Sequence, residues 1–460
     1  MSNGSYDVVV LGGGPGGYAA ALRAALLGQK VAIVERDKVG GTCLHRGCIP
    51  TKGLLHAAEV LDTIRDAKTY GITVNEPEFD WAAVQKSKSE PIKKLHSGLS
   101  SLIKARKIDL VNADGKLGPR GTIKAGDKDV TGRQVILAVG SYARYFPGME
   151  PDGERVITSD HALTRETLPR SIAIIGAGAV GVEFASVYRS FGVDVTVIEA
   201  LPRIVPLEDA DVSKELTASF GKRGIAVHAG AKVQDIDRSK DLLKVTFSKG
   251  DKTASVDVEQ VLVAVGRGPS TDGLDLDSWG IKSERGYILT DDTYLAGDGV
   301  WAVGDAVAMS PQFAHVAFAQ GFSVAERIAG GTPVMLDYDR DVPHATYCNP
   351  EIASVGLTEE AARERGMDVE VHKHGFTGIA KAQILHQPRG FAKIVAEKGG
   401  RIVGLHIIGP RVTELLSEIL LAVGWEAYPS ELAGLVHPHP TLSEVVGEAA
   451  LAAIGRPLHG

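Results

Sequence analysis

The sequence predicts an α/β protein that contains two similar βαβ motifs and ends in an α+β domain. Residues 6–35 and 170–199 repeat one pattern, in which an apolar β-type run leads into Gly-x-Gly-x-x-Gly, a helical stretch and a second β run. After about residue 340 the pattern changes: the strand-like runs RGFAKIVAE and RIVGLHIIG are followed by the helical runs TELLSEILLAVGW and SEVVGEAALAAIG.

The composition is that of an ordinary globular protein. A chain of 460 residues has room for about three domains, and its 44% apolar residues can fill several cores. Gly is abundant at 54 but shows no collagen-like period and does not run with the 21 Pro, which excludes a fibrous or disordered protein. With 50 basic and 57 acidic residues the net charge is −7, so we expect neither nucleic acid nor membrane as a partner.

The N-terminus, the lack of a long apolar run and the few cysteines predict a cytoplasmic protein. The polar N-terminus runs directly into a strand-like VVVL without the features of a secretory signal. The apolar run at 415–423 is interrupted by Ser417 and Glu418, and is too short for a membrane span. Three cysteines do not make a structural disulfide framework, which indicates a reducing compartment.

The repeated glycines predict two dinucleotide sites. The first glycine of such a loop permits a tight turn, the second lets the backbone approach a pyrophosphate, and the third allows close helix–strand packing. An acidic residue at the end of the second strand can accept hydrogen bonds from a ribose. Two βαβ motifs that bind no ligand are the alternative. The matching positions, at one constant offset, are Gly12, Gly14, Gly17 and Glu35 in the first copy and Gly176, Gly178, Gly181 and Glu199 in the second. Two such sites imply electron transfer between two nucleotides, and thus an oxidoreductase.

Further strand-like runs support two Rossmann-like domains. QVILAVG at 134–140 and QVLVAVG at 260–266 are each expected to return the chain to a parallel sheet, and GVWAVGDA at 299–306 ends in Asp305. Ligands of such folds lie at the carboxyl ends of the strands, which makes Asp305 a cofactor candidate. The expected domains are 1–147 with 271–340 for the first nucleotide, 148–270 for the second, and 341–460 at the C-terminal end.

The segment GGTCLHRGCIPTK at 40–52 carries the predicted chemistry. Cys43 and Cys48 follow a possible helix start, where the helix dipole lowers a thiol pKa. On a regular helix five positions are about 500° of rotation, so the side chains would diverge, but Gly47 and Pro50 permit an irregular turn that brings the sulfurs together. We predict a redox disulfide. The alternatives are a buried thiol pair and a metal site, for which the chain has only Cys348 left as a further cysteine.

These motifs together resemble the flavoprotein disulfide reductases, and among them the dihydrolipoamide dehydrogenases. The resemblance spans the chain: it includes the cysteine segment, both glycine motifs, AVGD at 302–305, PEIASVGLTEEAA at 350–362 and HPHPTLSEVVGEAAL at 437–451. The last segment is the most specific, because Leu-Ser-Glu after His-Pro-Thr is characteristic of the lipoamide enzymes. The implied fold has an FAD-binding and an NAD-binding Rossmann-like domain followed by an α+β interface or dimerisation domain.

The resemblance also implies which residues bind the cofactors. A redox disulfide has to touch the flavin, and the cysteines follow the first glycine motif, so the first site is assigned to FAD and the second to NAD. Lys52 matches the family's lysine near the flavin N5, with Glu183 as its ion-pair partner; a cation there stabilises developing negative charge. The implied FAD contacts are Gly12, Gly14, Gly17, Glu35, Lys52, Gly115, Asp305, Phe313, Ala314 and His315. The implied NAD contacts are Gly176, Gly178, Gly181, Glu199, Val233 and Gly266.

His439 and Glu444 are the predicted acid–base pair. Thiol–disulfide exchange needs a thiolate, an imidazole is a suitable base, and a carboxylate on its other nitrogen fixes the tautomer. His437 is expected to be a surface residue, and no metal site is expected. By the resemblance, His439 of one subunit serves the cysteines of the other, so activity requires a homodimer.

The implied reaction is the oxidation of protein-bound dihydrolipoamide to lipoamide through a Cys43–Cys48 disulfide and FAD, with hydride transfer to NAD⁺. In this reading the substrate thiolate attacks Cys43, and Cys48 is left as a thiolate against the flavin. The implied partners are lipoyl domains and the cores of 2-oxo acid dehydrogenase or glycine cleavage complexes; which complex is served does not follow from the sequence.

The preference for NAD over NADP has a physical argument. Glu199 would repel a 2′-phosphate but accept a hydrogen bond from the 2′-hydroxyl of NAD. Related NADP-dependent glutathione reductases carry arginines where this chain has Ala200 and Pro206. Arg203 lies nearby in the sequence, and whether its side chain faces the ribose stays open at this point.

Other interpretations stay open at this point. A glutathione reductase should favour NADP, and a mercuric reductase needs a further C-terminal cysteine pair; a mainly structural subunit of a multienzyme complex is the third alternative. His45 and Arg46 stand where the family commonly has Asn-Val, either as solvent-side variation or as a changed carrier preference. Cys348 is expected to be an unpaired filler of the interface domain.

Overall fold

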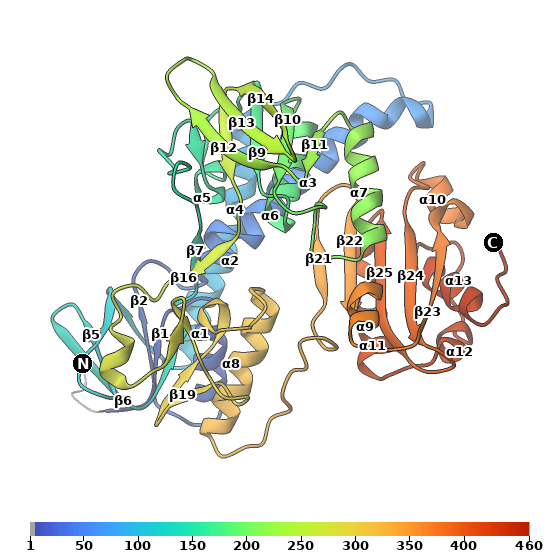
Figure 1. Cartoon of the computed structure of the whole chain (residues 1–460). Coiled ribbons are helices and arrows are strands. Elements are labelled where there is room, and N and C mark those ends of the chain that lie inside the picture. The colour runs from blue at the N-terminus through green and yellow to red at the C-terminus, as the bar shows by residue number, and fades with distance from the viewer. Residues whose placement is uncertain (1–4, 460) are drawn as a thin grey trace. The chain divides into compact units, whose positions relative to one another are not determined.

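The computed structural model describes residues 5–459, which divide into two compact units (Figure 1). Each unit gathers segments that are far apart in the sequence. The first consists of the described parts of Met1–Thr51, Gln85–Arg144 and Arg267–Leu336, and the second of those of Lys52–Val84, Tyr145–Gly266 and Asp337–Gly460. Within residues 5–459, no helix combines the length and apolar character needed to cross a membrane.

A largely parallel sheet forms the core of the first unit. β1 (Tyr6–Leu11) lies between β2 (Val31–Glu35) and β6 (Lys128–Leu137), and runs parallel to both. The side chains of Val8, Val9 and Val10 are fully buried, as in strands covered on both faces. The sheet order is β19-β20-β6-β1-β2-β3, with β19 (Leu295–Gly297), β20 (Val300–Ala302) and β3 (Asp109–Asn112). The run QVILAVG thus returns the chain to the parallel sheet, as predicted.

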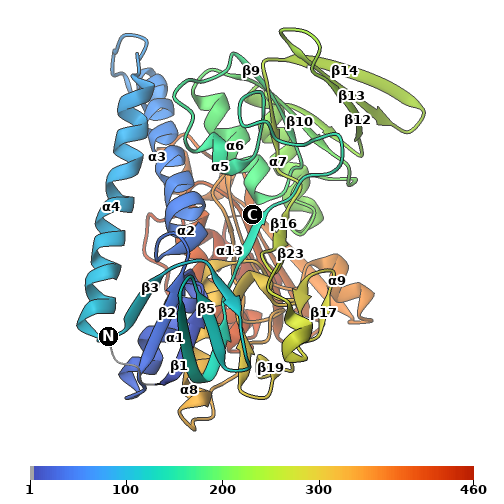
Figure 2. The ribbon, with the colours of Figure 1, turned by 90° about the vertical axis from the view of Figure 1, so that its left-hand side faces the viewer.

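Two helices of this unit, α1 (Pro15–Leu26) and α8 (Ala314–Ile328), lie side by side (Figures 1 and 2). Glycine makes the approach possible, since a Cβ on Gly321 would overlap the carbonyl oxygen of Gly16. The unit's other elements are α2 (Gly41–Arg46), β4 (Gly115–Leu117), β5 (Thr122–Ala125), β7 (Ser141–Ala143), β16 (Arg267–Pro269), η2 (Leu276–Trp279), β17 (Ser283–Glu284), β18 (Tyr287–Ile288) and η3 (Gly304–Ala306). α3 (Cys48–Arg65) and α4 (Trp81–Ala105) each have residues in both units.

The second unit contains the second βαβ motif. β9 (Ser171–Ile175), α6 (Ala179–Ser190) and β10 (Asp194–Glu199) repeat β1, α1 and β2, which confirms the predicted repeat. The parallel sheet has the order β11-β10-β9-β15-β8, with β8 (Val156–Ile157), β11 (Ala226–Ala229) and β15 (Gln260–Val263). β12 (Lys232–Asp237), β13 (Leu243–Lys249) and β14 (Lys252–Val258) form a separate antiparallel sheet, whose hairpin is clear in Figure 2. The helices here are η1 (Asp66–Tyr70), α5 (Ser159–Ala162) and α7 (Ala210–Lys222).

The C-terminal part of the second unit is an antiparallel sheet with helices, as the sequence predicts. The sheet order is β21-β22-β25-β24-β23, from β21 (His344–Thr346), β22 (Glu351–Gly356), β23 (Val369–Gly375), β24 (Phe391–Glu397) and β25 (Ile402–Gly409). The helices are α9 (Glu359–Glu364), η4 (Phe376–Gly378), α10 (Ala380–Ile384), η5 (Val412–Leu415), α11 (Leu416–Gly424), α12 (Pro429–Ala433) and α13 (Glu444–Ala453). The predicted strands and helices after residue 388 are thus confirmed, with shorter ends.

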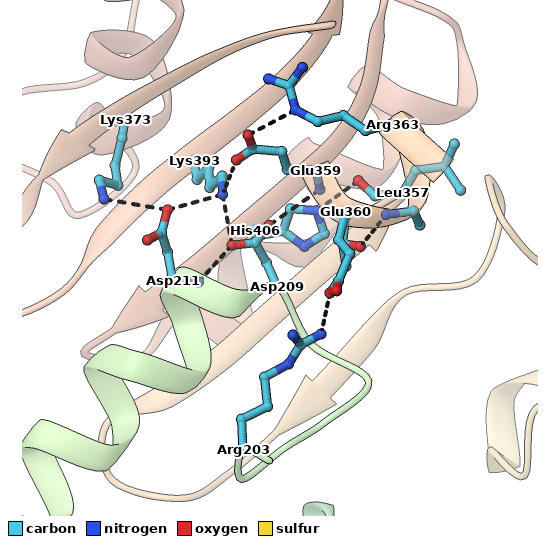
Figure 3. A network of polar contacts seen from close by, with 12 residues as sticks. Arg203, Asp209, Asp211, Leu357, Glu359, Glu360, Arg363, Lys373, Lys393 and His406 are labelled. Atoms are coloured by element: carbon cyan, nitrogen blue, oxygen red, sulfur yellow. Dashed lines mark hydrogen bonds and ion pairs between the residues drawn. The ribbon is translucent and has the colours of Figure 1, made fainter. Parts of the chain in front are cut away.

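A buried cation joins this sheet to α7 (Figure 3). The Nζ of Lys393 on β24 lies 2.8 Å from Asp209, 3.0 Å from Asp211 and 2.9 Å from Glu359. Asp209 is also the N-cap of α7, where its carboxylate accepts a hydrogen bond from the Asp211 N–H. Although burial alone would lower it, the pKa of Lys393 is raised by the hydrogen bonds to Asp209, Glu359 and Asp211. The network holds the end of the loop between β10 and α7 against the C-terminal sheet.

Candidate active site

The first glycine loop has the geometry that a bound pyrophosphate needs. Gly12 has φ +101°, and a Cβ there would overlap the carbonyl oxygen of Ala138. A Cβ on Gly17 would overlap the Gly12 carbonyl oxygen, so α1 can pack this closely only with glycine. A Cβ on Gly14, in contrast, would have only the Gly41 Cα nearby, at 3.9 Å. Gly14 is the N-cap of α1 and gives no side-chain cap, which leaves N–H groups at the helix start to bind an anion.

Glu35 ties this loop to the end of β2. Its carboxylate accepts hydrogen bonds from the backbone N–H groups of Gly13, at 2.6 Å, and Asp37, at 2.8 Å. The side chain is buried at 9% exposure, next to the glycine loop. Each carboxylate oxygen can accept two hydrogen bonds and here accepts one from the backbone, so Glu35 keeps acceptor capacity for a ribose hydroxyl.

The second glycine loop reproduces the first one contact by contact. Gly176 has φ +98°, and a Cβ there would overlap the carbonyl oxygen of Ala264. A Cβ on Gly181 would overlap the Gly176 carbonyl oxygen, whereas one on Gly178 would meet no atom within 4 Å. Glu199 accepts hydrogen bonds from the Ala177 N–H at 2.7 Å and from the Leu201 N–H at 2.8 Å. The donors follow the same offset as the glycines, so the two loops are built for the same kind of ligand.

The cysteine segment begins directly on the first loop. The Gly40 N–H donates a hydrogen bond of 2.8 Å to the Gly13 carbonyl oxygen. A Cβ on Gly41, where α2 begins, would lie 2.6 Å from the Gly14 Cα, so only glycine permits this approach. Cys43 is the third residue of α2. The segment therefore places a thiol within one helical turn of the nucleotide loop.

The predicted irregular turn between the cysteines is confirmed. α2 ends at Arg46, Gly47 adopts φ −144° and ψ −109°, and α3 begins at Cys48. Both cysteine side chains are half-buried. Tyr18 on α1 lies in their electrostatic surroundings: burial first, then the charges of Cys43 and Cys48, raise the pKa of its phenol to about 12. Sequence reasoning missed Tyr18, since nothing in its spacing connects it with the cysteines.

His45 and Arg46 differ in their surroundings. The ring of His45 is half-buried, with Nε2 2.9 Å from the Val39 carbonyl oxygen and the ring of His96 at 5.1 Å in an edge-on contact. Burial lowers the pKa of His45. Arg46 is exposed, 3.4 Å from Asp37. Arg46 thus lies at the solvent side, whereas the ring of His45 is only half-exposed.

Asp305 lies just beyond the carboxyl end of β20, as predicted. Its Oδ2 accepts a hydrogen bond of 2.5 Å from the Ser141 hydroxyl, to which Arg267 Nε also donates at 2.7 Å. Ser141 and Arg267 were missed by sequence reasoning. The available signal was that each directly follows one of the repeated AVG ends; the pairing of β7 with β16 then brings them together.

The remaining FAD candidates have mixed surroundings. Phe313 is the N-cap of α8, Ala314 is its first residue, and the rings of Phe313 and His315 stack at 5.2 Å. At Gly115 a Cβ would overlap the side chain of Leu11, so packing under β1 already explains that glycine.

Lys52 and Glu183 form an ion pair in the second unit. The Nζ of Lys52 lies 2.8 Å from each carboxylate oxygen of Glu183, whose side chain is only 5% exposed. The backbone N–H of Tyr347 donates a further hydrogen bond to Glu183 at 3.0 Å, and Lys52 lies over the Tyr347 ring at 4.6 Å. The sequence indicated the pair but not Tyr347, which only the tertiary structure brings there.

The two histidines of the HPHP segment each have a carboxylate partner. His439 Nδ1 lies 2.8 Å from Glu444, whose second oxygen accepts from the Thr441 N–H at 2.8 Å, and the His439 side chain is 68% exposed. His437, expected at the surface, is mostly buried at 12% exposure, with Nε2 2.7 Å from Glu418. That expectation is wrong, because the pairing with α11 draws the ring inward. The hydrogen bond that His437 donates to the Glu418 carboxylate raises the pKa of His437.

The nucleotide-side candidates lie around the second loop. Gly266 has φ +101° with open space at its Cβ position, and Val233 is a partly buried residue of β12. Arg203 does not extend toward Glu199 with a free guanidinium: its Nη2 lies 2.6 Å from Glu360 (Figure 3). Cys348 is buried and unpaired, with Sγ 3.2 Å from the Pro350 carbonyl oxygen, as a filler residue should be.

The two loops and the adjacent cysteine pair define a dinucleotide-dependent oxidoreductase of the disulfide type. The family model described as pyridine nucleotide-disulphide oxidoreductase matches residues 6–321, and that of the same family's dimerisation domain matches residues 342–450. The chain belongs to this family.

Several relatives that match over the whole length share one name. The dihydrolipoyl dehydrogenase of Bacillus subtilis is 43% identical over 99% of each chain, and that of Mycobacterium tuberculosis is 42% identical over 98%. The crystal structure of LpdA from Mycobacterium tuberculosis superposes with a TM-score of 0.89 at 26% identity, covering 97% of this chain and 99% of that one. The predicted fold class and the family resemblance are confirmed. A glutathione- or mercuric-reductase-like alternative is not favoured.

Proposed function

We propose that this chain is a dihydrolipoyl dehydrogenase, which oxidises protein-bound dihydrolipoamide and reduces NAD⁺. The observation that carries the proposal is the seating of the cysteine segment on the first glycine loop, with Gly41 against Gly14. Full-length relatives of that name support the choice of substrate.

FAD is assigned to the first glycine loop and NAD to the second, and the residues fit both groups. Gly14 and Gly178 leave room for a pyrophosphate, while Glu35 and Glu199 stand ready for a ribose. Gly115, Asp305, the residues 313–315, Val233 and Gly266 belong to the same assignment. When bound, FAD supplies a two-electron acceptor for the reduced cysteine pair and NAD⁺ a hydride acceptor. Lys52, held by Glu183, supplies a fixed positive charge for the flavin side.

The protein's own residues carry out the thiol chemistry. His439 takes the proton from one substrate thiol, and the Glu444 carboxylate on Nδ1 orients the ring and stabilises its protonated form. The resulting thiolate attacks the Cys43 sulfur of the oxidised pair, forms a mixed disulfide and expels Cys48 as a thiolate. The second substrate thiol then attacks the substrate sulfur of the mixed disulfide and closes the lipoamide ring, while its proton passes to the Cys43 sulfur, which is released as a thiol. Two electrons have passed from the substrate to the cysteine pair.

The assembly follows from the same assignment. The match to a dimerisation domain supports a homodimer, in which His439 of one copy serves the cysteines of the other. The domain limits proposed from the sequence are 1–147 with 271–340 for FAD, 148–270 for NAD and 341–460 for the interface. Lipoyl domains and the cores of 2-oxo acid dehydrogenase or glycine cleavage complexes are the proposed partners, and the cytoplasm is the proposed location.

Turnover of the Cys48→Ser protein is the first test. The purified holoprotein should form NADH rapidly from dihydrolipoamide and NAD⁺, whereas C48S should lose this turnover and keep its flavin absorbance. Cys348→Ser is the matched control, because that buried thiol takes no part in the proposed thiol exchange, and the variant should keep most of the activity. Wild-type turnover in C48S would refute the disulfide mechanism. A flavin-loaded wild-type protein that does not oxidise dihydrolipoamide would refute the substrate.

A further inference from the structure

We propose that Glu360 is a specificity-determining residue that keeps Arg203 away from the nucleotide's 2′-position and thereby disfavours NADP. This inference rests on the assignment of NAD to the second glycine loop. The Arg203–Glu360 pair acts against NADP in addition to the repulsion by Glu199, and it involves the C-terminal part of the second unit.

The backbone places Arg203 beside the ribose-binding end of the second βαβ motif. Leu201 donates its N–H to Glu199, and Val205 donates its N–H to the Ala177 carbonyl oxygen at 2.8 Å. Both anchors are therefore groups of the glycine loop or its acidic partner. Arg203 lies midway between them, so its Cα is within about 7.6 Å of the Cα of each anchor. A long cationic side chain at this place is within reach of a phosphate on the adenosine ribose.

The guanidinium is instead drawn toward α9. Its Nη2 lies 2.6 Å from the Glu360 carboxylate (Figure 3). The same nitrogen lies 3.5 Å from the Pro206 carbonyl oxygen. Nε is buried but finds no acceptor among residues 5–459. One carboxylate and one longer contact to a carbonyl oxygen, not a full set of acceptors, thus hold the arginine in its present direction.

The residue next to Glu360 is tied to α7 and to β24. The neighbouring Glu359 N–H donates to Asp209 at 3.3 Å, and the Glu359 carboxylate binds the buried Lys393. These contacts of Glu359 hold the start of α9, so a 2′-phosphate has to compete with the Glu360 carboxylate for Arg203. The same carboxylate also adds to the negative charge around the site. Both effects weaken NADP binding, whereas NAD has no group at the 2′-position that needs Arg203.

The test is the ratio of NADPH to NADH affinity, measured by titration calorimetry on the FAD-loaded protein at low ionic strength. The Arg203–Glu360 pair is partly exposed, and such pairs contribute up to about 1 kcal/mol, so Glu360→Gln should shift the ratio toward NADPH by roughly two- to fivefold. In the double variant Arg203→Ala with Glu360→Gln, most of this gain should disappear, because the cation that binds the phosphate is gone.

Glu364→Gln is the matched control. Glu364 is an exposed carboxylate on the same helix that forms no ion pair among residues 5–459, and its removal changes the net charge equally. An E360Q ratio equal to that of the wild type or of E364Q would overturn the inference, as would a gain that persists without Arg203. Failure of the wild type to bind either nucleotide would instead refute the assignment of the NAD site.

Discussion

Replacing Lys393 by methionine tests whether the buried cation stabilises the second unit. Lys393 and its partner Asp209 have side chains that are each 2% exposed. Methionine fills a similar volume without the charge, so K393M leaves a buried, uncompensated carboxylate and little cavity. Removing one partner of a buried pair costs about 3–5 kcal/mol. At about 2 °C per kcal/mol for a large cooperative unit, Tm should fall by roughly 6–10 °C.

Thermal unfolding of the holoprotein at pH 7, followed by circular dichroism, measures this change. Lys373→Met is the control: Lys373 pairs with Lys393 across β23 and β24, but its contact with Asp211 is longer, at 3.5 Å, and its side chain is 47% exposed. Such a pair contributes less than about 1 kcal/mol, so K373M should lower Tm by no more than about 2 °C. Adding Asp209→Asn to K393M should restore part of the loss. Equal shifts in the two lysine variants would refute the reasoning.

The same network predicts a dependence on pH. Although burial alone would raise them, the pKa values of Asp209 and Asp211 are lowered because Lys393 donates hydrogen bonds to both carboxylates. A lowered carboxylate pKa contributes stability that is fully present above the ordinary value of 3.8 and is lost as pH falls through the folded-state pKa. The Tm difference between the wild type and K393M should therefore hold down to about pH 4 and shrink as pH is lowered further toward about 2. A constant difference over this range would show that charge is not the cause.

Three further predictions concern the site itself. Gly176→Ala should abolish NADH binding and leave the protein yellow, whereas Gly12→Ala should prevent flavin binding, because each added Cβ would overlap a carbonyl oxygen. Flavin absorbance and nucleotide titration measure the two losses. If the losses were interchanged, the assignment of the two loops would be contradicted. His439→Gln should lower kcat by about 100-fold or more while flavin content stays unchanged, because the proton acceptor is removed; a smaller loss would exclude general-base catalysis by this ring. The raised pKa of His437 contributes stability that is fully present below its ordinary value of 6.5 and is lost as pH rises through the folded-state pKa. His437→Gln should therefore lower Tm more at pH 5.5 than at pH 9. The reverse order would contradict the pairing with Glu418.

The local motifs could be predicted because each depends on residues that are close together in the sequence. Gly12 and Gly17 need glycine for reasons within one turn of chain, and Gly47 interrupts a helix by its own backbone angles. Strand and helix periodicity likewise depends on neighbours, so both βαβ motifs and the C-terminal α+β pattern followed from the sequence. The paired glycine loops and the cysteine spacing were enough to predict an oxidoreductase.

Contacts between distant segments could not be predicted in this way. His437 was expected at the surface because nothing near it in the sequence reveals Glu418 on α11. Ser141 meets Arg267 only through the pairing of β7 with β16. In these cases the energy comes from burial and hydrogen bonding to a partner that the chain's local pattern does not specify.

The residues of the proposed chemistry could be predicted from the amino-acid sequence alone: two nucleotide loops, a cysteine pair and a histidine with its carboxylate. How these residues are held in place depends on the folded chain. It directs Arg203 to Glu360, buries Lys393 among three carboxylates and sets Tyr347 against the Lys52–Glu183 pair. Charges interact through space, so the direction and strength of each interaction depend on which groups the fold brings within a few ångströms, in surroundings that exclude water.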